Sequence, residues 1–382
     1  MRKPFHFVLP LAIACLASPL AAQTVCPGAN VIVNSPEDAL MLKVNGADNP
    51  QDQVAALDQF IQSNADSKFI PCAYEYETMA NVKLNQFDKA IEYGEKDLAA
   101  NYKNVNLMVN LAKAYVGAVK ITDTAFNVIM QAPDQIKAEA SAASRPAGIS
   151  DADWRKSQEA AKDDLAYMEY AFFNLLPRVS DAAKRVTLLG QFEKAYPDAD
   201  AKQVNYQYYL AYTLANQSEK ADAYGEKVIA ADPNDAEVLN RVAFDYANRR
   251  INLDKAAQYA KKVTTLVPAL KKPDGVADGQ FKTDQNNMVG MAHLTMGYVD
   301  FQRAGKTRRV APAIEEFKTA SGLLGGNPQL KGGALFYLGS AYEFEFPPNH
   351  HAAAEALSQS AGIASPWQAQ ARTLLARVKA AK

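Results

Sequence analysis

The sequence has 382 residues, of which 48% are hydrophobic and 22% are charged, and this composition is typical of a globular protein rather than a disordered one. The formal net charge is -1 at pH 7, and omitting Arg2 and Lys3, the only charged residues before Gln23, leaves 39 basic against 42 acidic side chains. This balance argues against nucleic acid or an anionic membrane surface as the main partner.

The first segment has the pattern of an export signal. Arg2 and Lys3 give it a basic start, an apolar run follows from Phe5 to Leu16, and Ala22 provides a small residue before Gln23. The apolar run is too short to span a bilayer as a permanent anchor. The sequence therefore predicts cleavage near residue 22 and a location in the periplasm or cell envelope of a bacterium.

Three cysteines are present, and two of them, Cys26 and Cys72, lie beyond the predicted signal. In an oxidising compartment an isolated pair tends to form a disulfide. We predict a Cys26 to Cys72 bridge, and two buried free thiols are the alternative. Cys15 offers a second alternative, in which the chain is a lipoprotein and associates with a membrane only through a lipid on that cysteine.

The next residues predict helices that need neighbours. A short helix is expected from Pro36 to Val44, and apolar residues at helical spacing predict an amphipathic helix from 51 to 64. From Pro71 onward a helix, a turn and a second helix predict a helical hairpin over residues 71–104.

One four-residue pattern occurs twice, as Tyr93-Gly94-Glu95-Lys96 and as Tyr224-Gly225-Glu226-Lys227, and recurs in phase as Tyr259-Ala260-Lys261-Lys262. The clearest unit spans residues 202–235 and ends at Pro233, which cannot continue a helix, while Asn234 or Asp235 can cap the next one. Small and aromatic residues at fixed offsets in a 34-residue helix-turn-helix resemble the tetratricopeptide repeat. The resemblance implies an all-α fold, a right-handed α-solenoid of helical hairpins with an irregular, enlarged middle section.

The resemblance is good over 71–104, 202–269 and 331–345, and it is loose between 105 and 200. There, Leu111 and Tyr115 fit a first helix, but no second helix with the usual spacing is expected after it. The predicted organisation is a signal peptide (1–22), an N-terminal arm and helix (23–70), one repeat followed by degenerate repeats (71–200), two regular repeats (201–270), and further repeats with a capping helix (271–382).

Signatures of catalysis and of cofactor or metal binding are weak. Gly305-Lys306-Thr307 resembles the end of a phosphate loop, but Asp300 stands where the first glycine is required. Lys306, Arg308 and Arg309 are expected to form a solvated basic loop, with contact to an anionic partner as the alternative. His350 and His351 lack companion ligands. We therefore expect a non-enzymatic protein without cofactor or metal.

The resemblance implies a protein or peptide partner, bound on the concave face by the first helix of each hairpin. Aromatic, methionine and amide side chains suit such a surface. The clamp for a chain-terminal carboxylate found in some members is not recognisable, although Asn110 and Lys113 are suggestive. The candidate contacts are Tyr206, Leu210, Asn240, Phe244, Met296, Phe336 and Phe344.

Packing between repeats is the alternative role for these side chains. A different class of function, a small-molecule carrier or enzyme, would use a pocket in the 120–200 region. Trp154, Tyr167, Phe172 and Phe173 are expected to gather there.

Overall fold

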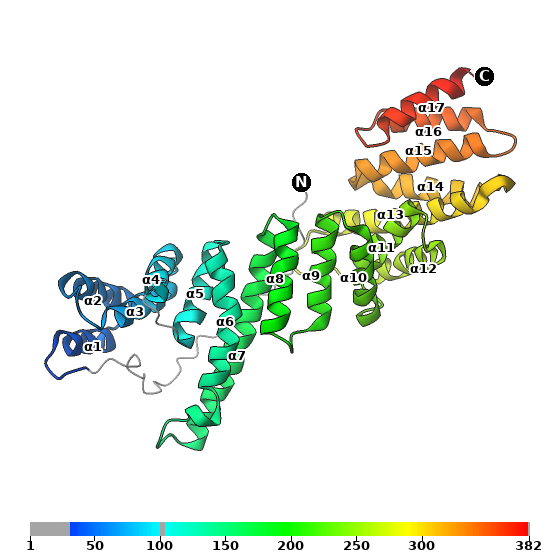
Figure 1. Ribbon diagram of the computed structural model, residues 1–382. Helices are drawn as coiled ribbons and strands as arrows, with labels where there is room; N and C mark the ends of the chain where they lie inside the picture. Colours follow the sequence, from blue (N-terminus) through cyan, green and yellow to red (C-terminus); the bar gives the residue numbers. More distant parts are fainter. Residues whose placement is uncertain (1–30, 100–103, 381–382) are drawn as a thin grey trace. The chain divides into compact units, whose positions relative to one another are not determined.

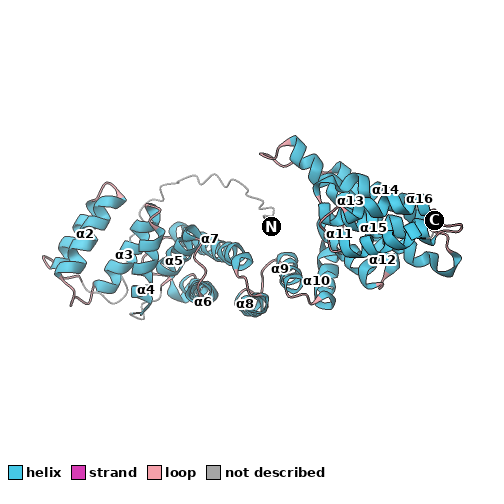
Figure 2. Ribbon diagram, turned by 90° about the horizontal axis from the view of Figure 1, so that it is seen from above, coloured by secondary structure: helices cyan, strands magenta, loops and turns pink. Residues whose placement is uncertain are grey.

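The computed structural model of the chain describes residues 31–99 and 104–380, and within these residues every regular element is helical (Figures 1 and 2). The first α-helices are α1 (Pro36–Gly46), α2 (Pro50–Ser63), α3 (Ile70–Lys83), α4 (Phe87–Ala99), α5 (Val105–Ala118), α6 (Asp123–Glu139), α7 (Asp151–Leu175) and α8 (Ala182–Ala195). They are followed by α9 (Ala201–Leu214), α10 (Ser218–Ala231), α11 (Ala236–Arg249), α12 (Leu253–Leu266), α13 (Asp278–Ala304), α14 (Ala311–Leu323), α15 (Pro328–Phe344), α16 (His350–Ala361) and α17 (Gln368–Ala380). Among the short 3-10 turns is η4 (Gly305–Thr307).

From α1 to α7 and from α9 to α17, helices that follow one another along the chain pack together, so the predicted all-α array of helical hairpins is confirmed. α3 packs on α4, α9 on α10 and α15 on α16, and each of these hairpins also contacts a flanking helix. Local caps define the helix starts. Asp235, predicted as a cap, accepts a hydrogen bond from the Val238 N–H at 3.1 Å and starts α11.

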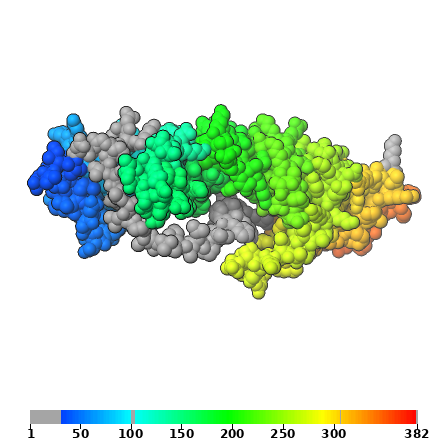
Figure 3. All heavy atoms as spheres, turned by 90° about the horizontal axis from the view of Figure 1, so that it is seen from below, coloured from blue at the N-terminus to red at the C-terminus, as the bar shows by residue number. Residues whose placement is uncertain are grey.

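Two details of the prediction are wrong. A second helix, α6, directly follows α5 and packs against it. Its buried residues Phe126, Ile129, Pro133 and Ile136 keep helical spacing. In addition, the sequence pattern predicts a linker after Pro268 and then a helix from Met288 to Arg303, but α13 begins at Asp278 and so contains ten further helical residues before Met288. Its first turns project from the surface in Figure 3.

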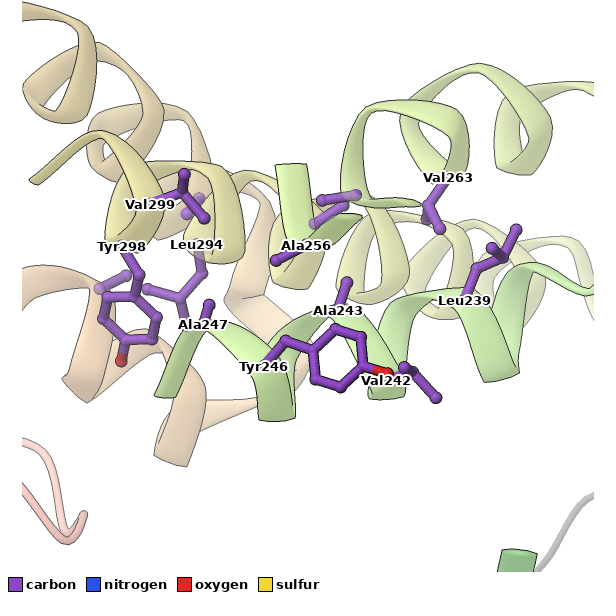
Figure 4. Close-up of a cluster of buried hydrophobic side chains, with 14 of the residues drawn as sticks. Leu239, Val242, Ala243, Tyr246, Ala247, Ala256, Val263, Leu294, Tyr298 and Val299 are labelled. Atoms are coloured by element: carbon purple, nitrogen blue, oxygen red, sulfur yellow. The ribbon is translucent and has the colours of Figure 1, made fainter. Parts of the chain in front are cut away.

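The chain divides into two compact units, which we describe separately. The first extends to Ser180 and includes 190–197, and the second comprises 181–189 and all residues from Asp198. The second unit has a core between α11, α12 and α13. In Figure 4, Val242 and Tyr246 of α11, Val263 of α12 and Leu294 of α13 belong to this buried cluster.

The repeated four-residue pattern joins successive hairpins. Glu95 accepts a hydrogen bond from the Tyr115 hydroxyl at 2.6 Å, and Glu226 accepts one from the Tyr246 hydroxyl at 2.9 Å. In both cases the donor lies twenty residues later, on the first helix of the next hairpin. The glutamate of the pattern therefore links one repeat to the next.

Glu226 is the better supported of the two glutamates. Its other oxygen accepts from the Tyr259 hydroxyl at 3.0 Å and lies 3.0 Å from Lys255 Nζ. Burial alone would raise the pKa of Glu226, but the hydrogen bonds from Lys255, Tyr246 and Tyr259 bring it below its usual value. The carboxylate thus remains charged and joins α10 to both helices of the following hairpin.

Cys72 is 3% exposed in α3 and packs in a core cluster with Leu57, Phe60 and Phe69. Its predicted partner Cys26 lies outside the described residues, so the bridge stays a prediction. We expect mature protein, unfolded in guanidinium without reductant, to show no thiol that reacts with Ellman's reagent. After reduction it should show two. Closing such a loop stabilises a protein by about 3–4 kcal/mol in the chain-entropy model. Two reactive thiols before reduction would exclude the bridge.

Candidate functional site: an aromatic pocket with two arginines

The second unit contains a pocket of about 730 Å³. This volume lies within the range usual for ligand sites. The C-terminal end of α11, the last turns of α13, the turn after α13, and α15 form its wall. We call it the arginine–aromatic pocket, and its lining is Ala247, Asn248, Arg250, Tyr298, Phe301, Gln302, Gly305, Arg308, Tyr337 and Phe344.

Contacts between aromatic rings shape the apolar wall of the pocket. The ring centroids of Tyr298 and Tyr337 are 4.5 Å apart in an edge-to-face arrangement, and those of Phe301 and Phe344 are 5.7 Å apart. Behind them, Phe317 of α14 packs on Tyr298 at 5.9 Å. Because these rings support one another, the apolar surface is formed before any ligand arrives.

Tyr298 also lines this wall, but its hydroxyl lies below the surface. The residue is 3% exposed, and its hydroxyl is buried beside Tyr337. Burial raises the pKa of Tyr298, and neighbouring Tyr337 raises it further, so the phenol remains protonated at neutral pH.

Arg308 is fixed rather than solvated, which corrects the expectation of a free basic loop. Its Nε donates to the Phe344 carbonyl oxygen at 2.6 Å, and its Nη2 donates to the Glu345 carbonyl oxygen at 3.1 Å. The guanidinium carbon lies 5.4 Å from the ring centroid of Phe344 and 5.5 Å from that of Phe346. Arg308 has a left-handed backbone (φ 57°), directly after η4. This turn directs it onto the C-terminal end of α15.

Arg250 supplies the second positive charge. It is the C-cap residue of α11, with φ 57°, and its backbone N–H donates to carbonyl oxygens of the last turn. A cation at a helix C-terminus is favoured by the helix dipole. Its side chain is exposed and makes no ion pair within the described part of the chain. The described lining of the pocket has these two arginines and neither aspartate nor glutamate.

A smaller cleft of about 280 Å³ lies nearby in the same unit, with Phe244 and Met291 among its lining residues. The Phe244 ring centroid is 5.9 Å from that of Tyr298, which lines the larger pocket. The cleft also contains Asp222, whose pKa is raised to about 7 by burial and by the nearby Asp245 carboxylate. Its polar surface is mixed in charge, unlike that of the larger pocket.

The structure does not bring the seven predicted contact residues to one surface. Phe344, 38% exposed, lines the arginine–aromatic pocket, and Phe244 lines the smaller cleft. Asn240 is wrong as an accessible contact, because it is 3% exposed and its amide donates to the Met288 carbonyl at 2.9 Å. The remaining candidates are partly buried against core clusters: Tyr206, Leu210 and Met296 on the main core of the second unit, and Phe336 on a cluster of α15, α16 and α17.

The four aromatic side chains named for an alternative pocket in the 120–200 region do not gather in one place. Phe172 is fully buried and stacks on Phe192 with ring centroids 4.2 Å apart, and Phe126 and Phe173 meet it edge-to-face. Trp154 does not join this cluster, because it is eighteen residues from Phe172 on one continuous helix, a separation of about 27 Å. These rings form a filled core.

The remaining sequence candidates have structural contacts. Asn110 donates to the Asn106 carbonyl at 2.8 Å, and the Lys113 ammonium lies 5.5 Å from the Tyr167 ring centroid. His350 Nδ1 is 2.8 Å from Glu343 Oε2. Among the residues that the structure describes, no cluster of three or more potential ligands could hold a metal ion, and no helix has the length and apolarity to cross a membrane.

The first unit contains buried carboxyl groups. Glu77 and Asp97 are 0% exposed, and Glu75 is 7% exposed. Burial, followed by the repulsion of Glu75, raises the pKa of Asp97 to about 8, and neither carboxyl oxygen of Asp97 has a hydrogen-bond partner in the described residues. Burial and the Asp58 carboxylate likewise raise the pKa of Glu77 to about 8, against the opposing effect of a hydrogen bond from Asn81. These groups make the stability of the unit sensitive to pH.

No protein-family model and no curated protein sequence matches this chain. Among solved structures it is similar to the Cut9 and Hcn1 hetero-tetramer of the APC/C, at 12% identity over 90% of each chain, with a TM-score of 0.27. It is also similar to yeast Tom70, at 12% identity over 90% of this chain and 95% of that chain, with a TM-score of 0.30. Scores this low mean that the structures do not superpose closely, so neither likeness supports an argument about function.

Proposed function

We propose that this chain is an exported, non-catalytic scaffold that binds a peptide or a partner protein on its array of helical hairpins. The observation that carries the proposal is the arginine–aromatic pocket. Its rings are held by a packed core, so a partner side chain can be buried there without first ordering the site. Aromatic and arginine side chains around a hollow are the usual anchors of protein interfaces.

The proposal predicts that a partner contacts the edge of the pocket. A photoreactive phenylalanine analogue at Phe344 should give a discrete cross-linked protein in periplasmic extract, identifiable by mass spectrometry. The same analogue at Tyr170, 54% exposed on α7 in the first unit, is the matched control and should not give that product. Equal cross-linking from both positions, or none from Phe344, would contradict a binding role for the pocket.

Export is the second part of the proposal and rests on the composition of residues 1–22. We expect the full-length chain to fractionate with the periplasm or envelope and to lose the signal segment. A variant lacking residues 2–22 should remain in the cytoplasm. Intact mass of the mature protein would also detect a lipid on Cys15, and cytoplasmic retention of the full-length chain would refute export.

A further inference from the structure

We infer that the arginine–aromatic pocket recognises an acidic side chain next to an aromatic side chain within a partner segment. This inference rests on the proposed function and adds the chemical class of the ligand. The pocket offers an apolar wall for a ring and two positive charges, and its described lining has no carboxylate to compensate the arginines. A ligand that combines a ring with a negative charge complements both features.

Arg250 is the group that would form the ion pair. Its side chain is exposed at the end of α11 and makes no salt bridge within the described residues, so pairing with a ligand would break no existing contact. By contrast, Arg249, the residue before it, is engaged by Asp222 at 2.7 Å and Asp245 at 3.0 Å. Arg249 therefore forms ion pairs within the fold, whereas Arg250 lines the pocket and is available to a ligand.

Arg308 contributes charge and shape rather than a clamp. Two of its five N–H groups already bind the carbonyl oxygens of Phe344 and Glu345. Its guanidinium also faces the Phe344 ring, so the cation and the aromatic wall are held together. Arg250 and Arg308 lie on different elements, and only Arg250 has a guanidinium without hydrogen bonds to the described residues. The pocket therefore suits one side-chain carboxylate within a segment better than a chain-terminal carboxylate held by both arginines.

The rest of the lining fits the same ligand. The exposed Asn248 amide can bind the backbone of a segment passing Arg250. The ring of the ligand would then pack beside Phe301 and Phe344, whose edge-to-face contact already forms the apolar wall.

The test uses small probes that differ in one group. Acetyl-Phe-Glu-amide and acetyl-Phe-Gln-amide have the same shape and differ in charge, acetyl-Ala-Glu-amide lacks the ring, and acetyl-phenylalanine has only a terminal carboxylate. Binding to the full mature chain is measured by ligand-detected NMR titration. We expect the Phe-Glu probe to bind roughly 5-fold more tightly than the Phe-Gln probe, as for a partly exposed ion pair. The difference should shrink as salt is raised.

Arg250→Gln should abolish the preference for glutamate, whereas Arg372→Gln, the same change at an exposed residue of α17 outside the lining, should preserve it. Circular dichroism of both variants shows whether each is folded, and Arg250→Lys should restore part of the preference. Equal binding of the glutamate and glutamine probes overturns the inference, as does binding of acetyl-phenylalanine but of none of the other probes. If Phe344 still cross-links a partner when the inference fails, the proposed scaffold function stands and only the ligand class is wrong. If Phe344 gives no cross-link and the probes show no preference for glutamate, both the scaffold function and the ligand class are refuted.

Discussion

Replacing Asp97 by asparagine is expected to stabilise the first unit at pH 8 by about 2 kcal/mol or more, with little effect at pH 4. The pKa of Asp97 is raised to about 8 in the folded chain, whereas the usual value is 3.8. The folded state therefore binds more protons than the unfolded state between these two values. Stability is greatest at the acidic end of this window and falls as the pH rises toward 8. Asparagine carries no charge to bury, so the variant does not lose the stability that the parent chain loses when Asp97 ionises.

The remaining pH dependence should come from Glu77 and Glu75. The pKa of Glu77 is raised from 4.5 to about 8 and burial also raises the pKa of Glu75, so both contributions have the same sign as that of Asp97. The variant should consequently become less steep in its pH dependence without becoming flat. Each group can contribute at most about 1.4 kcal/mol per pH unit within the window.

The measurement is hydrogen exchange of the amides of α3, α4 and α5, with each rate corrected for the intrinsic effect of pH. Local exchange is preferable because long repeat arrays need not unfold in a single step. Asp66→Asn is the matched control, since Asp66 is exposed in the connection before α3. An Asp97→Asn variant whose protection falls with pH as steeply as that of the parent chain would show that Asp97 is already ionised in the folded state.

The sequence predicted the features of this fold that depend on local pattern. Helical spacing identified α2, α9 and α11, and the residues after Pro233 predicted a cap at Asn234 or Asp235, of which the structure has Asp235. The four-residue pattern was found from the sequence, but not its role. The link from Glu95 to Tyr115 is a contact between two hairpins, and nothing in either helix alone indicates it.

The candidate site was largely missed, because it depends on contacts between distant residues. Phe344 was found from its position in a hairpin, but Arg308 reaches it only through a left-handed turn and bonds a carbonyl thirty-six residues away. Asn240 had the right helical position and the wrong environment, because the Met288 carbonyl of α13 covers its amide. The basic residues after α13 were noticed in the sequence, but the pattern could not show that the Arg308 side chain is held by hydrogen bonds rather than solvated.

Gly225→Leu is expected to destabilise the second unit by about 3 kcal/mol, because there is no space for its side chain. A Cβ at Gly225 would lie 2.6 Å from Val242 Cγ2 and 3.3 Å from Tyr209 Cδ2. Val242 and Tyr209 are both buried, at 1% and 4% exposure, so neither can move aside without disturbing the core. The glycine allows α10 to approach both its own partner helix and the first helix of the next hairpin.

The matched control is Gly322→Leu. Gly322 lies in α14, is exposed, and has nothing within 4 Å of an added Cβ. Leucine there should be neutral or stabilising by up to about 1 kcal/mol, because it favours helix more than glycine does. Urea unfolding followed by circular dichroism should therefore show a lower midpoint for the first variant only. Equal midpoints would show that the close approach at Gly225 does not limit stability.

The third copy of the four-residue pattern has Ala260 at the position of Gly225, and Ala260 is fully buried. If the space available to the side chain, rather than backbone freedom, selects the glycine, Gly225→Ala should destabilise the unit less than Gly225→Leu does.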